Sequence, residues 1–227
     1  MVGWGRVASH TAYGENRFRD LEDWWTELSG SAIVRDEVDL PGTGPVAFGS
    51  IAYAAGSPRG GTLVVPEVVV GRRGGQCWVT TLSVGELPAA LPTLPAVEPP
   101  LPPRDVRYAD GAQSSTAWAQ AVAEAVERIT AGRLDKVVLA RDLLAQSSDV
   151  IDVRWLLRRL ADRYDTTWTF AVDGLVGATP ELLVRREKGL VTSRVLAGAI
   201  RRTGDDEHDL ALAASLALAS TRAVSWP

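Results

Sequence analysis

The chain has 227 residues, of which 46% are hydrophobic, and a formal net charge of −4 at pH 7. A chain of this length can bury a sizeable core in one or two domains, and the absence of a basic surplus argues against nucleic-acid binding. No long apolar helix or lysine-rich run indicates a membrane, and Met1 to Arg6 carries no apolar signal segment, so we expect a cytoplasmic protein.

The cysteine and histidine content limits the possible chemistry. Cys77 is the single cysteine, and His10 and His208 are the two histidines. One cysteine cannot form an internal disulfide, and three such residues do not suffice for a typical thiolate or imidazole metal site. We therefore expect neither.

The first part of the chain predicts one helix followed by strands. Asn16 to Leu28 shows helical spacing of apolar residues, with Asn16 as N-cap and Gly30 placed to end the helix. Apolar runs between glycine- and proline-rich turns predict three strands, over Pro45–Ala54, Thr62–Val70 and Gln76–Leu82. Gly71 to Gly75 predicts a hairpin loop, because it lacks the lysine and serine or threonine that end a phosphate-binding loop.

A proline-rich segment divides the chain. Pro88 to Pro103 holds seven prolines in sixteen residues, which is typical of an extended connection rather than a helix or strand. We therefore predict a strand-rich scaffold region over residues 1–103 and a second region over residues 104–227.

The second region predicts alternating helices and strands. Gly132 is placed to end the first of its helices, and Asp173-Gly174 is a strong hairpin signal. Strands joined by such short turns should be antiparallel. The predicted helices are Ser115–Thr130, Asp152–Tyr164 and Asp206–Ser220, and the predicted strands are Lys136–Arg141, Trp168–Val172, Leu175–Ala178, Leu182–Arg186 and Leu190–Leu196.

Lys136 opens an apolar strand-like run and is the first candidate catalytic residue. In a strand, side chains alternate between faces, so Lys136 shares a face with Val138 and Ala140. A partly desolvated lysine loses its preference for the ammonium form, and a neutral amine can act as a general base. The alternative is a lysine at an exposed strand start, with its ammonium group in water.

Glu181 is the second candidate. It follows Pro180, whose ring fixes its own backbone angle and disfavours the helical region for Thr179, so the glutamate enters the next strand from a defined direction. The alternative is a turn whose charged residue is simply solvated.

Three motifs in fixed order resemble the chorismate-utilising enzymes, and the resemblance extends over about Trp118 to Ser220. They are Lys-Val-Val-Leu-Ala-Arg from Lys136, Gly-Ala-Thr-Pro-Glu-Leu-Leu from Gly177, and Leu-Ala-Gly-Ala-Ile-Arg-Arg from Leu196. The family includes isochorismate, salicylate, anthranilate and aminodeoxychorismate synthases. Members that add ammonia usually carry glutamine where this chain has Lys136, so the resemblance is to the isochorismate synthase type, which adds water.

The resemblance implies a division of chemical roles. Lys136 would deprotonate water for attack at C2 of chorismate, and Glu181 would protonate the departing C4 hydroxyl. Ala197 and Gly198 fall in the loop that lines the substrate pocket in the family. The implied fold is α+β, with antiparallel sheets packed face to face and helices outside, and residues 104–227 would be the first part of its catalytic region.

The resemblance also implies Mg²⁺ as cofactor, with its glutamate ligands in a part of the family sequence that this chain lacks. By position the first of them should fall near Trp226. We therefore expect the chain alone to convert little or no chorismate, and the complete protein to be a monomer whose partner is the small molecule chorismate, without nucleic acid or membrane. Alternatives are a salicylate synthase or a non-catalytic remnant of the family, and the sequence does not separate menaquinone from siderophore synthesis.

Overall fold

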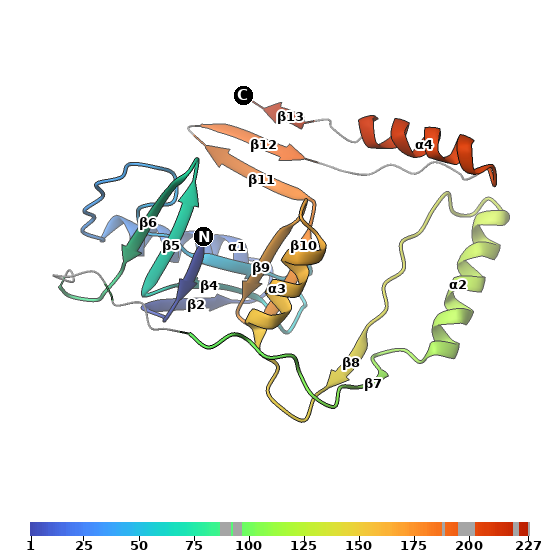
Figure 1. Ribbon diagram of the computed structural model, residues 1–227, viewed down its shortest axis with the longest axis horizontal. Helices are drawn as coiled ribbons and strands as arrows, with labels where there is room; N and C mark the ends of the chain where they lie inside the picture. Colours follow the sequence, from blue (N-terminus) through green and yellow to red (C-terminus); the bar gives the residue numbers. More distant parts are fainter. Residues whose placement is uncertain (87–91, 93–96, 188, 195–202, 220–222, 227) are drawn as a thin grey trace. The chain divides into compact units, whose positions relative to one another are not determined.

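The computed structural model describes residues 1–86, 92, 97–187, 189–194, 203–219 and 223–226. It divides into two compact units, one formed by Met1–Val97 with Leu157–Pro227 and one by Glu98–Leu156. The predicted division into scaffold and catalytic regions concerns function, and it stays a prediction. Figure 1 shows the elements of both units in chain order.

The first unit contains the strands of the N-terminal region. They form two three-stranded sheets, ordered β1-β5-β6 and β2-β4-β3, in which neighbouring strands are antiparallel. The strands are β1 (Val2–Trp4), β2 (Ala8–Ala12), β3 (Phe48–Ile51), β4 (Gly61–Val65), β5 (Val68–Arg73) and β6 (Gln76–Thr81).

The N-terminal predictions were right about type and less accurate about extent. The single strand predicted over Thr62–Val70 is two strands, because Pro66 and Glu67 interrupt it and Pro66 has no N–H to donate. The loop predicted at Gly71–Gly75 is confirmed as a hairpin, with Gly74 and Gly75 at φ of 56° and 84°. The short strands β1 and β2 were not predicted.

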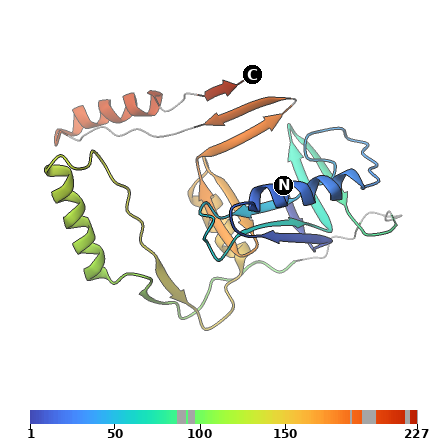
Figure 2. The same cartoon turned by 180° about the vertical axis from the view of Figure 1, so that it is seen from behind.

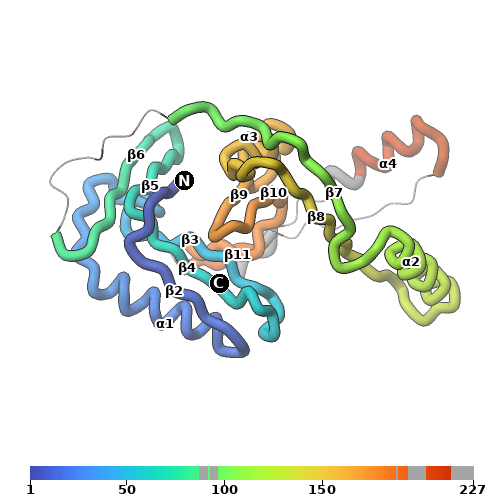
Figure 3. The backbone as a smooth tube through the Cα atoms, turned by 90° about the horizontal axis from the view of Figure 1, so that it is seen from below, coloured from blue at the N-terminus to red at the C-terminus, as the bar shows by residue number. Residues whose placement is uncertain are grey.

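Helix α1 (Arg17–Gly30) packs on the β2-β4-β3 sheet, as the tube view in Figure 3 shows. Leu21 is almost fully buried there, and a side chain on Gly61 would collide with it. Asn16 occupies the predicted N-cap position but makes no side-chain capping hydrogen bond. Phe18 is exposed, because the helix turns the side with Arg17 and Leu21 inward.

Arg17 fixes the start of α1 to the loop after β3. Its buried guanidinium donates to the carbonyl oxygens of Gly14 at 2.9 Å, Ala52 at 2.9 Å and Tyr53 at 2.5 Å. A buried charge is costly unless its donors find acceptors, and these three carbonyls supply them.

The rest of the first unit consists of paired strands, helix α4 (Asp206–Ala219) and most of helix α3 (Val153–Arg163), and Figure 2 shows them from behind. The predicted turn at Asp173-Gly174 is confirmed, with φ of 47° and 85°. These elements are β9 (Trp168–Val172), β10 (Leu175–Thr179), β11 (Leu182–Glu187), β12 (Leu190–Arg194), α4 (Asp206–Ala219) and β13 (Ala223–Trp226), with β9 paired to β10 and β12 between β11 and β13.

Contacts within the first unit connect these hairpins to the N-terminal strands. β3 contacts β9, Arg6 lies 3.5 Å from the carboxylate of Asp173, and Arg73 lies 3.0 Å from that of Glu187. The ion pairs are exposed, so each contributes little to stability. The hairpins nevertheless flank Glu181, which lies between β10 and β11.

The second unit is a helix with one strand pair. β7 (Arg107–Asp110) pairs with β8 (Leu143–Gln146), and α2 (Ser115–Thr130) lies between them in sequence, with the bounds predicted for it. Helix α3 (Val153–Arg163), also predicted, begins at the end of this unit and continues into the first.

The antiparallel pairing predicted for the strands is confirmed wherever strands pair. The face-to-face packing of sheets stays an expectation from the resemblance. None of the helices in the described part of the chain has the length and apolar character needed to cross a membrane.

Gly71 tests the packing of the N-terminal core. A Cβ at this position would lie 2.2 Å from two ring atoms of buried Trp78, whereas a Cβ on Gly44 would meet nothing within 4 Å. We expect Gly71→Ala to lower the free energy of unfolding by about 1–3 kcal/mol, as overpacking typically does. Urea denaturation measures it, with Gly44→Ala as control, and equal midpoints for the two variants would contradict this packing.

Candidate functional site

Lys136 lies in the connection between α2 and β8, in the second unit. The strand predicted over Lys136–Arg141 is wrong for this structure: residues 136–142 have no regular secondary structure, and β8 begins at Leu143. Lys136 and the apolar residues after it are exposed. A run of strand-forming residues stays irregular when no neighbouring backbone pairs with it.

Helix α2 fixes one end of this connection. The Ser114 side chain caps the helix by accepting from the N–H of Ala117 at 3.2 Å. At the other end Gly132 has a φ of 70°, and the N–H of Arg133 donates to the carbonyl of Arg128 at 2.9 Å. The predicted stop at Gly132 is therefore confirmed as a glycine C-terminal turn.

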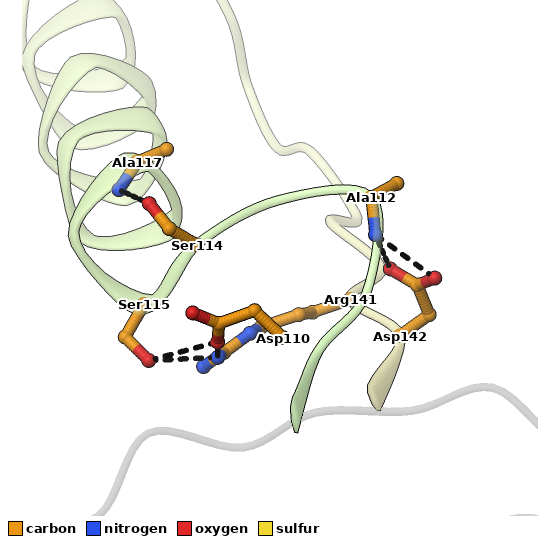
Figure 4. A network of polar contacts seen from close by, with 7 residues as sticks. All are labelled: Asp110, Ala112, Ser114, Ser115, Ala117, Arg141 and Asp142. Carbon is orange, nitrogen blue, oxygen red and sulfur yellow. Dashed lines mark hydrogen bonds and ion pairs between the residues drawn. The ribbon is translucent and has the colours of Figure 1, made fainter. Parts of the chain in front are cut away.

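Arg141 fixes the other end of the connection. Its Nη2 donates to Oδ1 of Asp110 at 2.8 Å and to Oγ of Ser115 at 2.8 Å. The Ser115 hydroxyl lies 3.3 Å from the same Asp110 oxygen, so the three side chains form a closed network at the start of α2 (Figure 4). The network connects the end of β7 and the start of α2 to the segment just before β8.

Asp142 makes a second connection to the same turn. Both its carboxylate oxygens accept from the N–H of Ala112, at 2.9 and 3.1 Å (Figure 4). A Cβ on Gly111 would lie 2.2 to 2.4 Å from the carboxylate atoms of Asp142, so only glycine allows this approach. Arg141 and Asp142 together hold the C-terminal end of the Lys136 run.

Sequence reasoning missed this network. Arg141 and Asp142 lie about thirty residues from Asp110 and Ala112, and no local motif connects the two segments. The one available signal was Asp110-Gly111 before the Ser114-Ser115 helix start, which is typical of a turn that enters a capped helix. That signal predicts the turn but not the Arg141 and Asp142 that contact it.

Glu181 follows β10 in the first unit, and its side chain is exposed. The Thr179 hydroxyl donates to its Oε2, and the Glu181 N–H donates to the Thr179 oxygen at 3.3 Å. The hydroxyl hydrogen bond, which favours the charged carboxylate, lowers the pKa of Glu181 below its ordinary value of 4.5, and a backbone hydrogen bond adds to the effect. A general acid requires a shift in the opposite direction.

The two candidate catalytic residues belong to different units, Lys136 to Glu98–Leu156 and Glu181 to the other. That they face one cavity stays a prediction. Ala197 and Gly198, which the resemblance places in the pocket loop, lie outside the described residues, which omit 195–202.

The described residues do not fit a metal ion. Among them, no three His, Cys, Asp or Glu side chains gather into a group that could hold one. The Mg²⁺ that the resemblance implies therefore has no ligand set in the described part of the chain.

The sequence matches the model of one protein family, described as chorismate binding enzyme, over residues 1–221. It is 29% identical to the isochorismate synthase MenF of Bacillus subtilis, covering 92% of this chain and 50% of the relative. It is 28% identical to a salicylate biosynthesis isochorismate synthase of Pseudomonas aeruginosa, covering 95% of this chain and 50% of the relative.

The fold is similar to the crystal structure of DhbC from Bacillus anthracis, with a TM-score of 0.56 and 23% identity over 94% of this chain and 50% of that one. At this identity the likeness shows the fold alone. The chain spans about half the length of the relatives it matches.

The contact between Gly111 and Asp142 predicts how fast the backbone amide of Ala112 exchanges with solvent. Gly111→Ala should displace the Asp142 carboxylate and release the Ala112 N–H, so that this amide exchanges with solvent faster. Hydrogen exchange followed by NMR measures it. Asp142→Ala should have the same effect, while Asp142→Asn keeps an acceptor and should protect the amide; unchanged exchange in Gly111→Ala would show that the contact does not form.

The Thr179 hydroxyl gives a prediction about pH. Thr179→Val should raise the pKa of Glu181 toward 4.5, while Thr179→Ser keeps the donor and the lowered value. Because the native-state pKa lies below the unfolded one, the stabilisation is complete above the unfolded pKa and is lost as the pH falls through the native one. NMR titration of the Glu181 carboxyl measures the shift. An identical Glu181 pKa in Thr179→Val and in the unchanged protein would contradict this role of the hydroxyl.

Proposed function

Because this chain belongs to the family of chorismate binding enzymes, we propose that it contributes the catalytic base and acid to an isochorismate synthase, which converts chorismate to isochorismate. The observation that carries the proposal is the family match over residues 1–221, together with relatives in two bacteria that are named isochorismate synthases. Since the chain spans about half of those relatives, the activity belongs to the complete protein.

The reaction exchanges one hydroxyl for another. Water loses a proton to the Lys136 amine as its oxygen bonds to C2, the ring double bonds shift, and the C4–O bond breaks. The departing oxygen takes a proton from Glu181 and leaves as water. One C–O bond forms and one breaks, so no oxidant or reductant is needed, and hydroxide never has to leave unassisted.

The surroundings of Lys136 must change for this role. A lysine serves as base only in its neutral form, which burial favours and water opposes. In this structure Lys136 is exposed, and the described residues provide no cover for it. Catalysis therefore requires further protein or bound substrate over the run.

Glu181 needs a comparable change. The Thr179 hydroxyl holds its carboxylate in the charged form, which cannot donate a proton. Desolvation by bound substrate opposes that effect and favours the protonated acid. The Thr179–Glu181 pair is thus the resting arrangement of the proposed acid.

Two alternatives to this proposal are a salicylate synthase, which makes a different product, and a non-catalytic member of the family, which makes none. A salicylate synthase would use the same lysine and go on to eliminate pyruvate, which chromatography of the products detects. A non-catalytic member of the family would neither turn over chorismate nor be stabilised by it. The exposure of Lys136 and the absence of a metal-ligand group among the described residues favour this second alternative for the chain taken alone.

The proposal also includes a cofactor, Mg²⁺, and leaves the pathway of the product to other enzymes. Mg²⁺ would be held by residues outside those described, and whether the product enters menaquinone or siderophore synthesis is decided by the enzymes that consume it. We propose a monomer, consistent with a site assembled within one complete family fold.

The function is tested by joining this chain to the half of the Bacillus subtilis relative that it does not match. We expect conversion of chorismate to isochorismate, and Lys136→Ala should lower kcat by roughly 10²- to 10⁴-fold, as loss of a positioned base does. Arg133→Ala removes a neighbouring exposed charge and should leave kcat unchanged. The purified 227-residue chain alone should convert little or no chorismate.

Two results would contradict the proposal. If turnover is unchanged in Lys136→Ala, Lys136 is not the catalytic base. A folded joined protein that neither converts chorismate nor gains thermal stability in its presence would favour the non-catalytic alternative.

A further inference from the structure

The chain contains two Asp-Gly pairs, Asp110-Gly111 and Asp173-Gly174. In such a pair the aspartate carboxyl can react with the backbone nitrogen that follows it, because glycine has no side chain to hinder the approach. The two aspartate side chains are similarly exposed, Asp110 at 48% and Asp173 at 44%. Exposure therefore does not separate the two pairs, and their contacts must.

The carboxylate of Asp110 is held by a closed network. Its Oδ1 accepts from the guanidinium of Arg141 at 2.8 Å and lies 3.3 Å from the hydroxyl of Ser115 (Figure 4). A carboxyl carbon that bonds to the following nitrogen must leave these partners. Each contact that has to break lowers the population of the reactive arrangement.

The backbone after Asp110 is crowded as well. A Cβ on Gly111 would lie 2.2 to 2.4 Å from the carboxylate atoms of Asp142, which also accept from the N–H of Ala112. The Asp142 carboxylate therefore occupies the space beside Gly111. Rotation of the peptide between Asp110 and Gly111 has to displace it.

The Asp173-Gly174 pair lies at the tip of the β9-β10 hairpin, and its surroundings are open. Val172 and Leu175 form the last pair of the ladder, and among the described contacts the N–H of Gly174 donates no hydrogen bond. A Cβ on Gly174 would meet no described atom within 4 Å. The carboxylate of Asp173 has one described partner, Arg6, at 3.5 Å.

The hairpin that carries this tip can open locally. Among the described strands β10 pairs only with β9. A two-stranded pair is marginally stable, and the exposed end of such an element opens at a small cost in free energy. The Asp173 carboxyl can then reach the nitrogen of Gly174.

We propose that Asp173-Gly174 is the site at which this chain forms isoaspartate, and that the network around Asp110 protects the other pair. The protonated Asp173 carboxyl is attacked at Cγ by the Gly174 nitrogen. The new C–N bond closes a five-membered imide, the Cγ–O bond breaks, and the oxygen leaves as water with the amide proton. One water then opens the ring at the main-chain carbonyl, which becomes the free carboxyl, so no oxidant or reductant is needed.

The product changes the turn that precedes the proposed acid. Isoaspartate adds one CH₂ group to the backbone, which a two-residue turn between Val172 and Leu175 does not accommodate. The contact with Arg6 is lost, and β10 leads directly to Thr179, the hydroxyl partner of Glu181. The enzyme class that would act on this site is a carboxyl methyltransferase that recognises isoaspartate. The modification does not depend on the proposed function.

The test is to keep the purified 227-residue chain at physiological pH and temperature for several weeks and to map isoaspartate by mass spectrometry with electron-transfer fragmentation. Trypsin places the two pairs in separate peptides, Tyr108–Arg128 and Tyr164–Arg185. We expect at least about threefold more isoaspartate at position 173 than at position 110, because the contacts of Asp110 must break first. In urea the two pairs should react at similar rates.

Three variants test the cause of the difference. Arg141→Ala should raise isoaspartate at position 110 and leave position 173 unchanged, while Arg133→Ala, which removes a neighbouring charge outside the network, should change neither. Asp173→Asn enters the same imide with loss of ammonia and should yield isoaspartate faster.

Four results would overturn the proposal. They are equal or greater modification at position 110 in the folded chain, the absence of isoaspartate at position 173, the same excess at position 173 in urea, and an unchanged position 110 in Arg141→Ala. An Asp173→Asn protein that keeps its amide throughout would show that the turn prevents ring closure and would overturn it as well.

Discussion

Backbone pairing is the constraint on which the arrangement of this protein depends. Every strand among the described residues pairs with at least one antiparallel neighbour, including strands such as β1 and β2 that the sequence did not predict. The run from Lys136 to Arg141 has the residues of a strand and lacks a neighbour in the described structure, so it stays irregular. The proposed catalytic base lies at the start of the one strand-like run that has no pairing partner among the described residues.

The polar network around Arg141 fixes the C-terminal end of that run. Asp110 and Ser115 bind the Arg141 guanidinium, and Asp142 binds the Ala112 N–H across Gly111. These groups are exposed, and exposed pairs contribute little energy singly. Their contribution is geometric, because they hold in place the C-terminal end of the run that Lys136 begins.

The sequence predicted what local rules determine. The helices α2, α3 and α4 and the hairpin at Asp173-Gly174 follow from apolar spacing, capping residues and turn residues, and all four are confirmed. Properties that depend on distant partners were not accessible in the same way. The strand at Lys136 failed because pairing is not local, and the contact of Asp142 with Ala112 could not be seen because thirty residues separate them. Glu181 was found by resemblance, while the hydroxyl that lowers its pKa was not considered.

We propose that the amine of Lys136 and the carboxyl of Glu181 act on opposite sides of one small ring in the complete enzyme. The most direct measurement is a crystal structure of this chain in complex with the unmatched half of a relative, with chorismate bound. We expect both side chains at about 2.6–3.2 Å from the ligand or from a water beside it. Side chains that point into separate regions of solvent, with no ligand between them, would contradict it.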